Sequence, residues 1–354
     1  MKTALVYDRV NKWGGAERIL LSLHKLFPQA TLFTSVYHPN SAPWAKVFST
    51  VISSFLQNFP FAQKRHDLYA PLMPLAFESF DFSDYDLVIS VTSESAKGII
   101  TKPGTRHICY CLTPTRYLWS GYDEYINTSL RRALLKPVIA YLRKWDKIAA
   151  QRPDVIVSIS NTVKERVEKY YSRSSTVIYP PARVDHGSKG GGGDYYLVVS
   201  RMVPYKKVDL VIEVFNRLDK PLVIVGAGSE ERRLRSMAKK NIKFAGFVND
   251  ADLGQYYKNC RALIFPQEED FGIVPVEAQS FGKPVIAHKS GGAVETVTNK
   301  TGMFFERQTA GDLLDAIQRF EVRHFAEKDC INNAKRFGEE KFLESFANMV
   351  DILV

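Results

Sequence analysis

The chain has 354 residues, enough for about two domains of ordinary size. Hydrophobic residues make up 45% and charged residues 24%, which is typical of a globular protein with a large core and excludes an intrinsically disordered chain. The net charge of +10 suits anionic partners, namely nucleotides, nucleic acid or an anionic membrane surface, and does not choose among them.

The opening segment MKTALVYDRV lacks the apolar core and cleavage site of a secretory leader, and no stretch approaches the ~20 apolar residues of a membrane-spanning helix. We therefore expect a cytoplasmic protein. Of its four cysteines, Cys109 and Cys111 share one face of a predicted strand. No second pair stands at zinc-site spacing, so all four are expected to be buried free thiols.

The first half of the chain alternates apolar strand patterns with helical ones. The glycine pair Gly14-Gly15 separates the first strand from a helix with apolar residues at helical spacing, Ala16–Leu26. Such alternation predicts a parallel sheet covered by helices on both faces. The strands are expected at Thr3–Tyr7, Ala30–Ser35, Asp86–Val91, His107–Leu112 and Val155–Ser158.

A break follows at residues 180–194, where Pro180-Pro181 and the glycine-rich stretch Ser188–Asp194 favour an interdomain connection. Alternation then restarts and predicts a second doubly wound domain. Its strands are expected at Tyr196–Ser200, Pro221–Val225, Lys243–Ala245, Ala262–Phe265 and Pro284–Ala287. Its helices are expected at Val208–Leu218, Glu230–Lys239, Asp252–Asn259 and Val274–Phe281, with a helical tail over Ala326–Val354.

The segment Cys260–Gly292 carries the clearest pattern for chemistry. Glu269 follows a predicted strand at its carboxyl end, where open α/β sheets bind ligands, and can accept the hydroxyls of a sugar. Glu277 lies inside the next helix and can accept two ribose hydroxyls. Three backbone N–H groups open that helix and can receive a phosphate: those of Gly272, Ile273 and Val274.

This segment resembles the Glu-x(7)-Glu signature of the group 1 family of retaining glycosyltransferases with the GT-B fold. In that family the first Glu contacts the donor sugar and the second contacts the donor ribose, roles that fall on Glu269 and Glu277. The resemblance implies an α/β protein of two Rossmann-like, doubly wound parallel-sheet domains that face each other across a cleft. Residues 1–182 would form the acceptor-side domain and 183–337 the nucleotide-sugar domain, with a helix at about 338–354 packing back on the first.

A second similarity lies in Ser200–Lys207, which resembles the Gly-Arg-x(4)-Lys element after the first strand of that family's second domain. The matching residues, Arg201 and Lys206, would neutralise the diphosphate. A diphosphate leaving group gains negative charge as the glycosidic bond breaks, so two fixed cations stabilise the transition state most.

Glycine loops supply further similarities. Gly14 and Gly15 correspond to the family's loop after the first strand, and Gly226 to a loop around the donor base. Glycines 291 and 292 permit close approach of the backbone. These loops lack the complete Gly-x-Gly-x-x-Gly pattern with an acidic residue about twenty positions on, which argues against a nicotinamide-dependent dehydrogenase.

The stretch His107–Trp119 is similar to a segment of family members that make bacterial polysaccharides. Many of those carry a His before the Thr-Pro pair, where this chain has Leu112. His107 is a candidate substitute, although its place at the start of a buried strand favours a structural role. The loop beyond the Thr-Pro pair would shape the sugar or acceptor pocket with Arg116, Tyr117 and Trp119.

Two other patterns allow competing interpretations. Asp84-Tyr85-Asp86 has the form of a metal-binding Asp-x-Asp motif but directly precedes a strand, which it is expected to cap. The basic stretch 131–152 can be a solvated helix face or a surface that lies on an anionic membrane.

The resemblance therefore implies transfer of a hexose from a nucleotide diphosphate sugar, with GDP-mannose favoured and UDP-sugars second, to a glycan or lipid-linked acceptor. No further cofactor, no metal and no nucleic-acid partner are expected. Contact with the inner face of the membrane would run through the basic segment. Two alternatives remain, a GT-B-fold sugar-nucleotide epimerase and a nucleotide-sugar-binding scaffold without catalysis.

Overall fold

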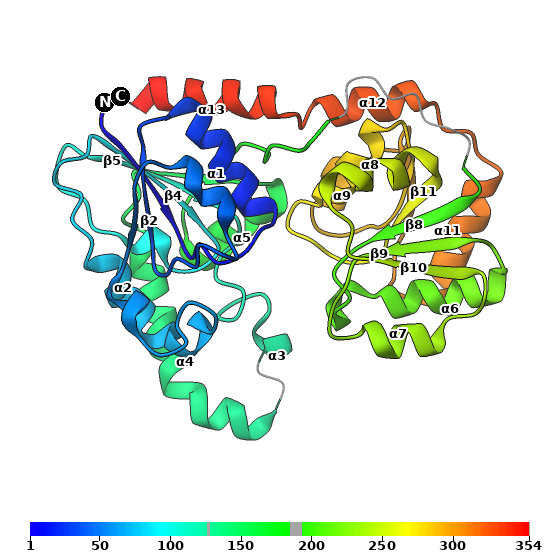
Figure 1. The fold of residues 1–354 in the computed structure, drawn as a ribbon, viewed down its shortest axis with the longest axis horizontal. Coiled ribbons are helices and arrows are strands. Elements are labelled where there is room, and N and C mark those ends of the chain that lie inside the picture. The colour runs from blue at the N-terminus through cyan, green and yellow to red at the C-terminus, as the bar shows by residue number, and fades with distance from the viewer. Residues whose placement is uncertain (126–127, 185–192, 354) are drawn as a thin grey trace. The chain divides into compact units, whose positions relative to one another are not determined.

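The computed structural model describes residues 1–125, 128–184 and 193–353, and these form two compact units (Figure 1). The first unit comprises Met1–Pro180 with Phe342–Val354, and the second comprises Pro181–Lys341. Both are parallel-sheet α/β domains, as the alternation of the sequence predicts. Three glycines of the predicted glycine-rich connection, Gly190 to Gly192, lie outside the described residues.

The first unit is built on a seven-stranded parallel sheet with the order β3-β2-β1-β4-β5-β6-β7. Its central strands are continuous apolar runs, and all six residues of β4 are buried, as expected of strands that helices cover on both faces. The strands are β1 (Thr3–Tyr7), β2 (Thr31–Thr34), β3 (Val51–Ser53), β4 (Leu87–Thr92), β5 (Arg106–Cys111), β6 (Val155–Ser158) and β7 (Thr176–Val177).

The helices of this unit are α1 (Gly15–Leu26), α2 (Met73–Glu78), α3 (Tyr122–Tyr125), α4 (Ser129–Ala149) and α5 (Asn161–Tyr171), with 3₁₀ turns at Pro43–Val47, Phe55–Asn58, His66–Leu72 and Ala96–Gly98. On one face of the sheet, α2 packs against β1 and β4, bringing Met73 and Phe77 into one core with Val6 and Val88. Cys109 and Cys111 lie on β5 as buried free thiols, as predicted.

The second unit has a six-stranded parallel sheet with the order β10-β9-β8-β11-β12-β13. Its strands are β8 (Tyr195–Val199), β9 (Leu222–Val225), β10 (Ile242–Gly246), β11 (Cys260–Phe265), β12 (Val285–His288) and β13 (Gly302–Phe305). Its helices are α6 (Val208–Leu218), α7 (Glu231–Met237), α8 (Asp250–Asn259), α9 (Ile273–Ser280), α10 (Ala293–Thr296), α11 (Ala310–Glu321) and α12 (Glu327–Lys335), with a 3₁₀ turn at Pro204–Lys206.

Helices cover both faces of this second sheet, which has a separate core on each side (Figure 1). Successive residues of a strand point to opposite faces. Tyr196 and Val198 of β8 therefore join the core beneath α6, α7 and α11, whereas Leu197 joins the core beneath α8, α9 and α10.

The last helix, α13 (Glu339–Leu353), leaves the second unit and continues in the first. Its side chains Phe342 and Phe346 pack on Tyr110 of β5, with ring centroids 5.8 and 6.1 Å from the tyrosine ring. The predicted helical tail is therefore two helices, with a break between Lys335 and Glu339.

Candidate functional site

The carboxyl edge of the second sheet brings Lys206 and Glu269 together. Lys206 lies in the 3₁₀ turn beyond β8, and Glu269 lies in the loop beyond β11. Because β8 and β11 are parallel neighbours, their carboxyl ends meet at one edge. The Lys206 ammonium donates a hydrogen bond to Oε1 of Glu269 and forms an ion pair with it. This is a partly buried pair, with the side chains of Lys206 and Glu269 11% and 23% exposed.

Glycines shape the backbone around Glu269. The Gly292 N–H donates to the carbonyl oxygen of Glu269 at 2.8 Å. Gly291 has a φ of +57°, and a Cβ there would lie 2.3 Å from the same carbonyl oxygen. The backbone of the loop that carries Glu269 therefore closely approaches this glycine pair, as expected. Only a residue without a side chain permits such an approach.

Helix α9 begins directly beyond this loop and carries Glu277. Gly272 precedes it with a φ of +84°, so the chain turns sharply before the N–H groups of Ile273 and Val274. Glu277 is buried, and its Oε2 accepts a hydrogen bond from the Tyr257 hydroxyl at 2.9 Å. The first N–H groups of a helix have no carbonyl partner within the helix and favour an anion, and the carboxylate of Glu277 stands one turn further on.

Arg201 follows β8 and is exposed, and its Nη2 donates to the Tyr205 hydroxyl at 2.5 Å. Gly226 directly follows β9 with a φ of +133°, and a Cβ there would lie 1.9 Å from the Ser200 carbonyl oxygen. Close packing of the chain against residue 200 is therefore a sufficient structural reason for a glycine at 226.

The predicted site residues of the first unit lie on two segments. Gly14 and Gly15 stand at the start of α1, and a Cβ at Gly15 would meet no atom within 4 Å. Two buried side chains beside this glycine loop were not predicted as site residues. Glu17 is buried in the first turn of α1, and the Tyr7 hydroxyl donates to its Oε1 at 2.7 Å. Burial and the neighbouring Glu17 carboxylate raise the pKa of Tyr7 well above its usual value.

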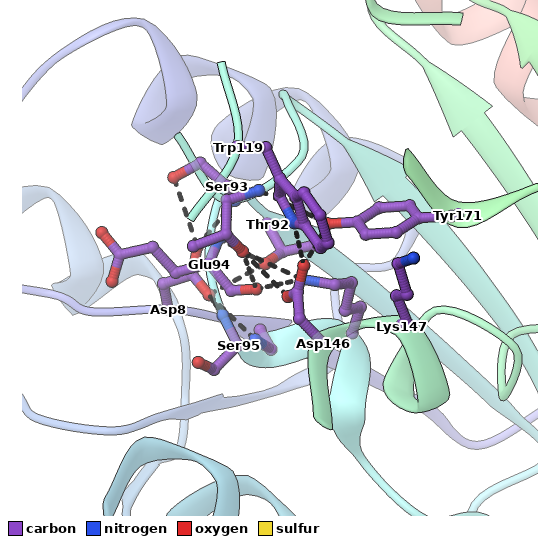
Figure 2. A network of polar contacts seen from close by, with 12 residues as sticks. Asp8, Thr92, Ser93, Glu94, Ser95, Trp119, Asp146, Lys147 and Tyr171 are labelled. Carbon is purple, nitrogen blue, oxygen red and sulfur yellow. Dashed lines mark hydrogen bonds and ion pairs between the residues drawn. The ribbon is translucent and has the colours of Figure 1, made fainter. Parts of the chain in front are cut away.

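Arg116, Tyr117 and Trp119 lie in the loop beyond β5, as predicted. All three are partly buried, and Trp119 is held in place by its surroundings. Its indole Nε1 donates to Asp146 Oδ2 at 2.7 Å (Figure 2). The Trp119 ring stacks on the Tyr170 ring, with the ring centroids 5.1 Å apart. Burial raises the pKa of Tyr117 well above its usual value.

Asp146 of α4 is the centre of a buried polar network that sequence patterns did not reveal (Figure 2). It forms an ion pair with Lys97 at 2.6 Å, with both side chains almost fully buried. The hydroxyls of Thr115 and Tyr171 also donate to it, at 2.9 and 2.8 Å. The loops beyond β4 and β5 are thereby tied to α4 and α5.

A second carboxylate, Asp8, anchors the loop beyond β4 to the end of β1 (Figure 2). Its two oxygens accept hydrogen bonds from the Thr92 hydroxyl and from the backbone N–H groups of residues 93 to 96, at 2.7 to 3.0 Å. Burial and the nearby Glu94 carboxylate raise the pKa of Asp8, and the amide hydrogen bonds oppose them. Two features of the sequence could have indicated this contact: an Asp directly after the first strand, and a Ser-Glu-Ser run directly after the strand that became β4.

His107 is wholly buried in β5, which favours the structural interpretation. Its Nε2 lies 2.9 Å from the Ser90 hydroxyl, and burial lowers its pKa to about 3. Leu112, where the polysaccharide-type segment has a His, is partly buried beyond the strand. Asp86 precedes β4 and accepts a hydrogen bond from the Lys2 backbone N–H at 2.7 Å, consistent with the expected capping role.

Most of the basic segment, residues 131–149, lies in α4, whose exposed positions include both cations and apolar residues. Within the described residues, no helix has both the length and the apolar character to cross a membrane. The exposed side chains of α4 include Arg132, Leu134, Leu135, Lys136, Tyr141, Lys144 and Ile148.

Comparison with known proteins finds similarity to one family, over the second unit. Residues 183–337 match the family model of the group 1 glycosyl transferases. The O-antigen chain mannosyltransferase C of Escherichia coli is 26% identical over 60% of this chain and 61% of its own length. A GDP-mannose-dependent monoacylated α-(1-6)-phosphatidylinositol monomannoside mannosyltransferase of Corynebacterium glutamicum is 38% identical over 30% of this chain and 32% of its own length. The chain thus spans less than two thirds of these curated relatives.

A solved structure shares the whole fold. HepE of Anabaena, crystallised in complex with UDP, matches with a TM-score of 0.73 at 18% identity, covering 99% of this chain and 100% of that one. The predicted GT-B class, two parallel-sheet α/β domains, is confirmed.

Proposed function

We propose that this chain, whose residues 183–337 match the group 1 glycosyl transferases, is a retaining glycosyltransferase that moves a hexose from a nucleotide diphosphate sugar to a hydroxyl group. The contact between Lys206 and Glu269 carries this proposal. It sets a cation beside the proposed sugar-binding carboxylate at the sheet edge. The loop that carries this carboxylate leads directly into the N-terminus of α9.

Each part of this edge suits one part of the donor. Arg201 and Lys206 would neutralise the diphosphate, together with the N–H groups of Gly272, Ile273 and Val274. Glu277, oriented by the Tyr257 hydroxyl, would accept the ribose hydroxyls. Glu269 would hold the sugar, and Gly226 would border the base.

The chemistry asked of these residues is charge stabilisation. The bond from the sugar C1 to the phosphate oxygen breaks, and its electron pair stays on the departing diphosphate. The acceptor oxygen then bonds to C1 from the same face, which retains the configuration, and its proton passes to a phosphate oxygen. Arg201 and Lys206 would stabilise the new negative charge on the diphosphate. One well-placed group of this kind lowers the activation free energy by about 3 kcal/mol.

Mannose from GDP-mannose is the favoured donor. Two of the relatives are mannosyltransferases, and one of them is GDP-mannose-dependent by name. UDP-sugars are second, because the Anabaena neighbour binds UDP. The O-antigen and phosphatidylinositol mannoside relatives make a glycan or lipid-linked acceptor the natural partner.

The first unit would supply the acceptor side. Gly14 and Gly15 offer N–H groups at the start of α1. Arg116, Tyr117 and Trp119 would line the sugar or acceptor pocket, with Trp119 fixed by Asp146.

A cytoplasmic protein with a lipid-linked acceptor needs access to the inner face of the membrane. The exposed side of α4 combines Lys136 and Lys144 with Leu134 and Ile148, a composition that binds anionic bilayers. Lys136→Glu/Lys144→Glu should lose flotation with vesicles containing phosphatidylglycerol, whereas Lys239→Glu/Lys240→Glu in the second unit should keep it. Equal flotation of both variants would contradict a role of α4 in membrane binding.

The deciding experiment is calorimetric titration of the chain with GDP, UDP, ADP and TDP. We expect micromolar binding of one nucleotide, weakened at least about tenfold in Glu277→Gln and Arg201→Ala. Arg217→Ala is the matched control, because Arg217 is exposed on α6 and pairs with Glu213. If no nucleotide binds, or if both site variants bind as well as wild type, the site is wrong.

Donor turnover separates the enzyme from its alternatives. A glycosyltransferase should release the nucleotide slowly from its donor by hydrolysis when no acceptor is present. Tight binding with no turnover, with or without acceptor, would favour a scaffold, and a rearranged nucleotide sugar would identify an epimerase.

A further inference from the structure

Gln267 is a polar residue with a buried side chain at the carboxyl end of β11. Only 1% of its surface is exposed. Its amide Nε2 donates a hydrogen bond to Glu269 Oε1 at 3.0 Å, whereas its Oε1 has no hydrogen-bond partner among the described residues. An acceptor buried without a partner lowers stability, so an apolar residue of the same length would suit the core better.

The two oxygens of the Glu269 carboxylate have different surroundings. Lys206 Nζ and Gln267 Nε2 both donate to Oε1. Throughout the described part of the chain, no side-chain or backbone donor contacts Oε2, although Glu269 is only partly exposed. Oε2 is therefore the oxygen that remains for the hydroxyl of a ligand.

The backbone on both sides of Gln267 is fixed independently of its amide. Gln308 Nε2 donates to the Pro266 carbonyl at 2.8 Å, and the Gly292 N–H holds the Glu269 carbonyl. The amide of Gln267 is thus not required to hold the loop, and its contact acts on the carboxylate alone.

The two donors to Oε1 differ in charge. The ammonium of Lys206 is attracted by a diphosphate and can turn towards it, but the neutral amide of Gln267 has no such attraction. When Lys206 serves the diphosphate, the amide still holds Oε1.

We infer that Gln267 is a positioning residue that fixes Glu269 with Oε2 presented to the transferred sugar, an inference that rests on the sugar-binding role proposed for Glu269. Gln267 acts through Glu269 and needs no contact with the reacting atoms. Its effect belongs to turnover, because a carboxylate that is free to rotate misplaces the sugar without altering the nucleotide site.

Gln267→Met is the sharpest variant, since it keeps the length of the side chain and removes the amide. For Gln267→Met we expect an unchanged or higher melting temperature, a nucleotide dissociation constant within about twofold of wild type, and a kcat for donor hydrolysis lower by about 10- to 100-fold. Glu268→Gln is the control, because Glu268 is exposed one residue away and accepts from the Ser290 hydroxyl. It should leave kcat unchanged.

Three results would overturn the inference: an unchanged kcat in Gln267→Met, a loss of nucleotide affinity equal to the loss of kcat, or a lowered melting temperature, which marks a structural amide. If the wild-type chain turns over no nucleotide sugar, the proposed function fails first, and the role of Gln267 in sugar transfer falls with it. A wild type that turns over its donor beside an equally active Gln267→Met variant overturns only the inference.

Discussion

Lys206 and Glu269 stand 63 residues apart in the sequence, and the Lys206 ammonium donates a hydrogen bond to Glu269 Oε1. The resemblance gave these residues separate tasks, the diphosphate for Lys206 and the sugar for Glu269. Their contact means that each also orders the other. A diphosphate that attracts Lys206 must therefore compete with Glu269, which couples the two halves of the proposed donor site.

This coupling predicts non-additive kinetics. We expect Lys206→Met to lower kcat/KM for donor hydrolysis by about two orders of magnitude, because a cation opposite the leaving group is lost. Glu269→Gln should have a similar effect, and the double variant should lose less than the product of the two. Lys300→Met, which removes an exposed cation from the same unit, is the control. Strictly additive losses would show that the two side chains act independently.

Gly291→Ala should damage the same loop from its backbone side. The new Cβ would lie 2.3 Å from the Glu269 carbonyl oxygen, at a φ of +57° that disfavours a side chain. We expect a loss of about 1–3 kcal/mol in the free energy of unfolding, measured by urea denaturation, and a lower kcat for donor hydrolysis.

Gly311→Ala provides the comparison for that variant. A Cβ at Gly311 meets no atom within 4 Å, and the residue lies in α11, where alanine is favoured by up to about 1 kcal/mol. Equal effects of the two substitutions would contradict the packing of Gly291 against the loop.

The buried pair of Lys97 and Asp146 should dominate the stability of the first unit. Lys97→Met leaves the Asp146 carboxylate buried without its cation, so we expect the free energy of unfolding to fall by about 3–5 kcal/mol. Lys144→Met, at an exposed position of the same helix, should change it by less than about 0.5 kcal/mol. Urea denaturation of both variants tests this difference.

The same pair gives a pH dependence of known sign. Burial is the largest single influence on the pKa of Lys97 and lowers it, but the attraction and the hydrogen bond of Asp146, with a smaller contribution from the two cysteines of β5, together raise the pKa overall. The stability it contributes is therefore fully present below the unfolded pKa of about 10.4 and is lost as pH rises through the folded value. Wild type should lose more stability than Lys97→Met above about pH 10.5, and parallel curves would contradict the ion pair.

Local pattern was sufficient for most of the fold. The helix predicted at Val208–Leu218 is α6 itself, and the strands Thr3–Tyr7 and Val155–Ser158 also begin and end where the sequence predicts. The strands that escaped prediction are short, such as β3 and β7, whose pairing depends on neighbours in the sheet rather than on their own residues. Between β2 and β4 the chain forms mainly 3₁₀ turns, which have no long apolar period to detect.

The candidate site likewise has a part that local sequence pattern predicted and a part that it did not. Glu269, Glu277 and the glycine turn between them follow one another in a single loop and helix, so their spacing was visible in the sequence. The partners of Lys206, Asp8 and Asp146 lie 25 to 88 residues away in the sequence and are brought together only by the order of the strands. Gln267 was not predicted, because no sequence pattern indicates that its amide oxygen is buried with no partner in the described part of the chain.

His107 offers a prediction that separates structure from catalysis. Burial lowers its pKa to about 3, with a smaller contribution from Arg152. Its folded pKa lies below the unfolded value of about 6.5, so the unfolded state binds the proton first and stability is lost as pH falls. Between pH 7 and pH 5 this group alone should remove about 2 kcal/mol from the free energy of unfolding.

His107→Gln should lose correspondingly less stability over that range, measured by urea denaturation at each pH. Because its pKa is lowered to about 3, the His107 imidazole also stays neutral throughout the range near neutrality. The pH profile of donor hydrolysis between pH 6 and pH 8 should therefore keep its shape in His107→Gln, whatever its height. Loss of a limb of that profile would assign His107 to the reaction and contradict its place in the core.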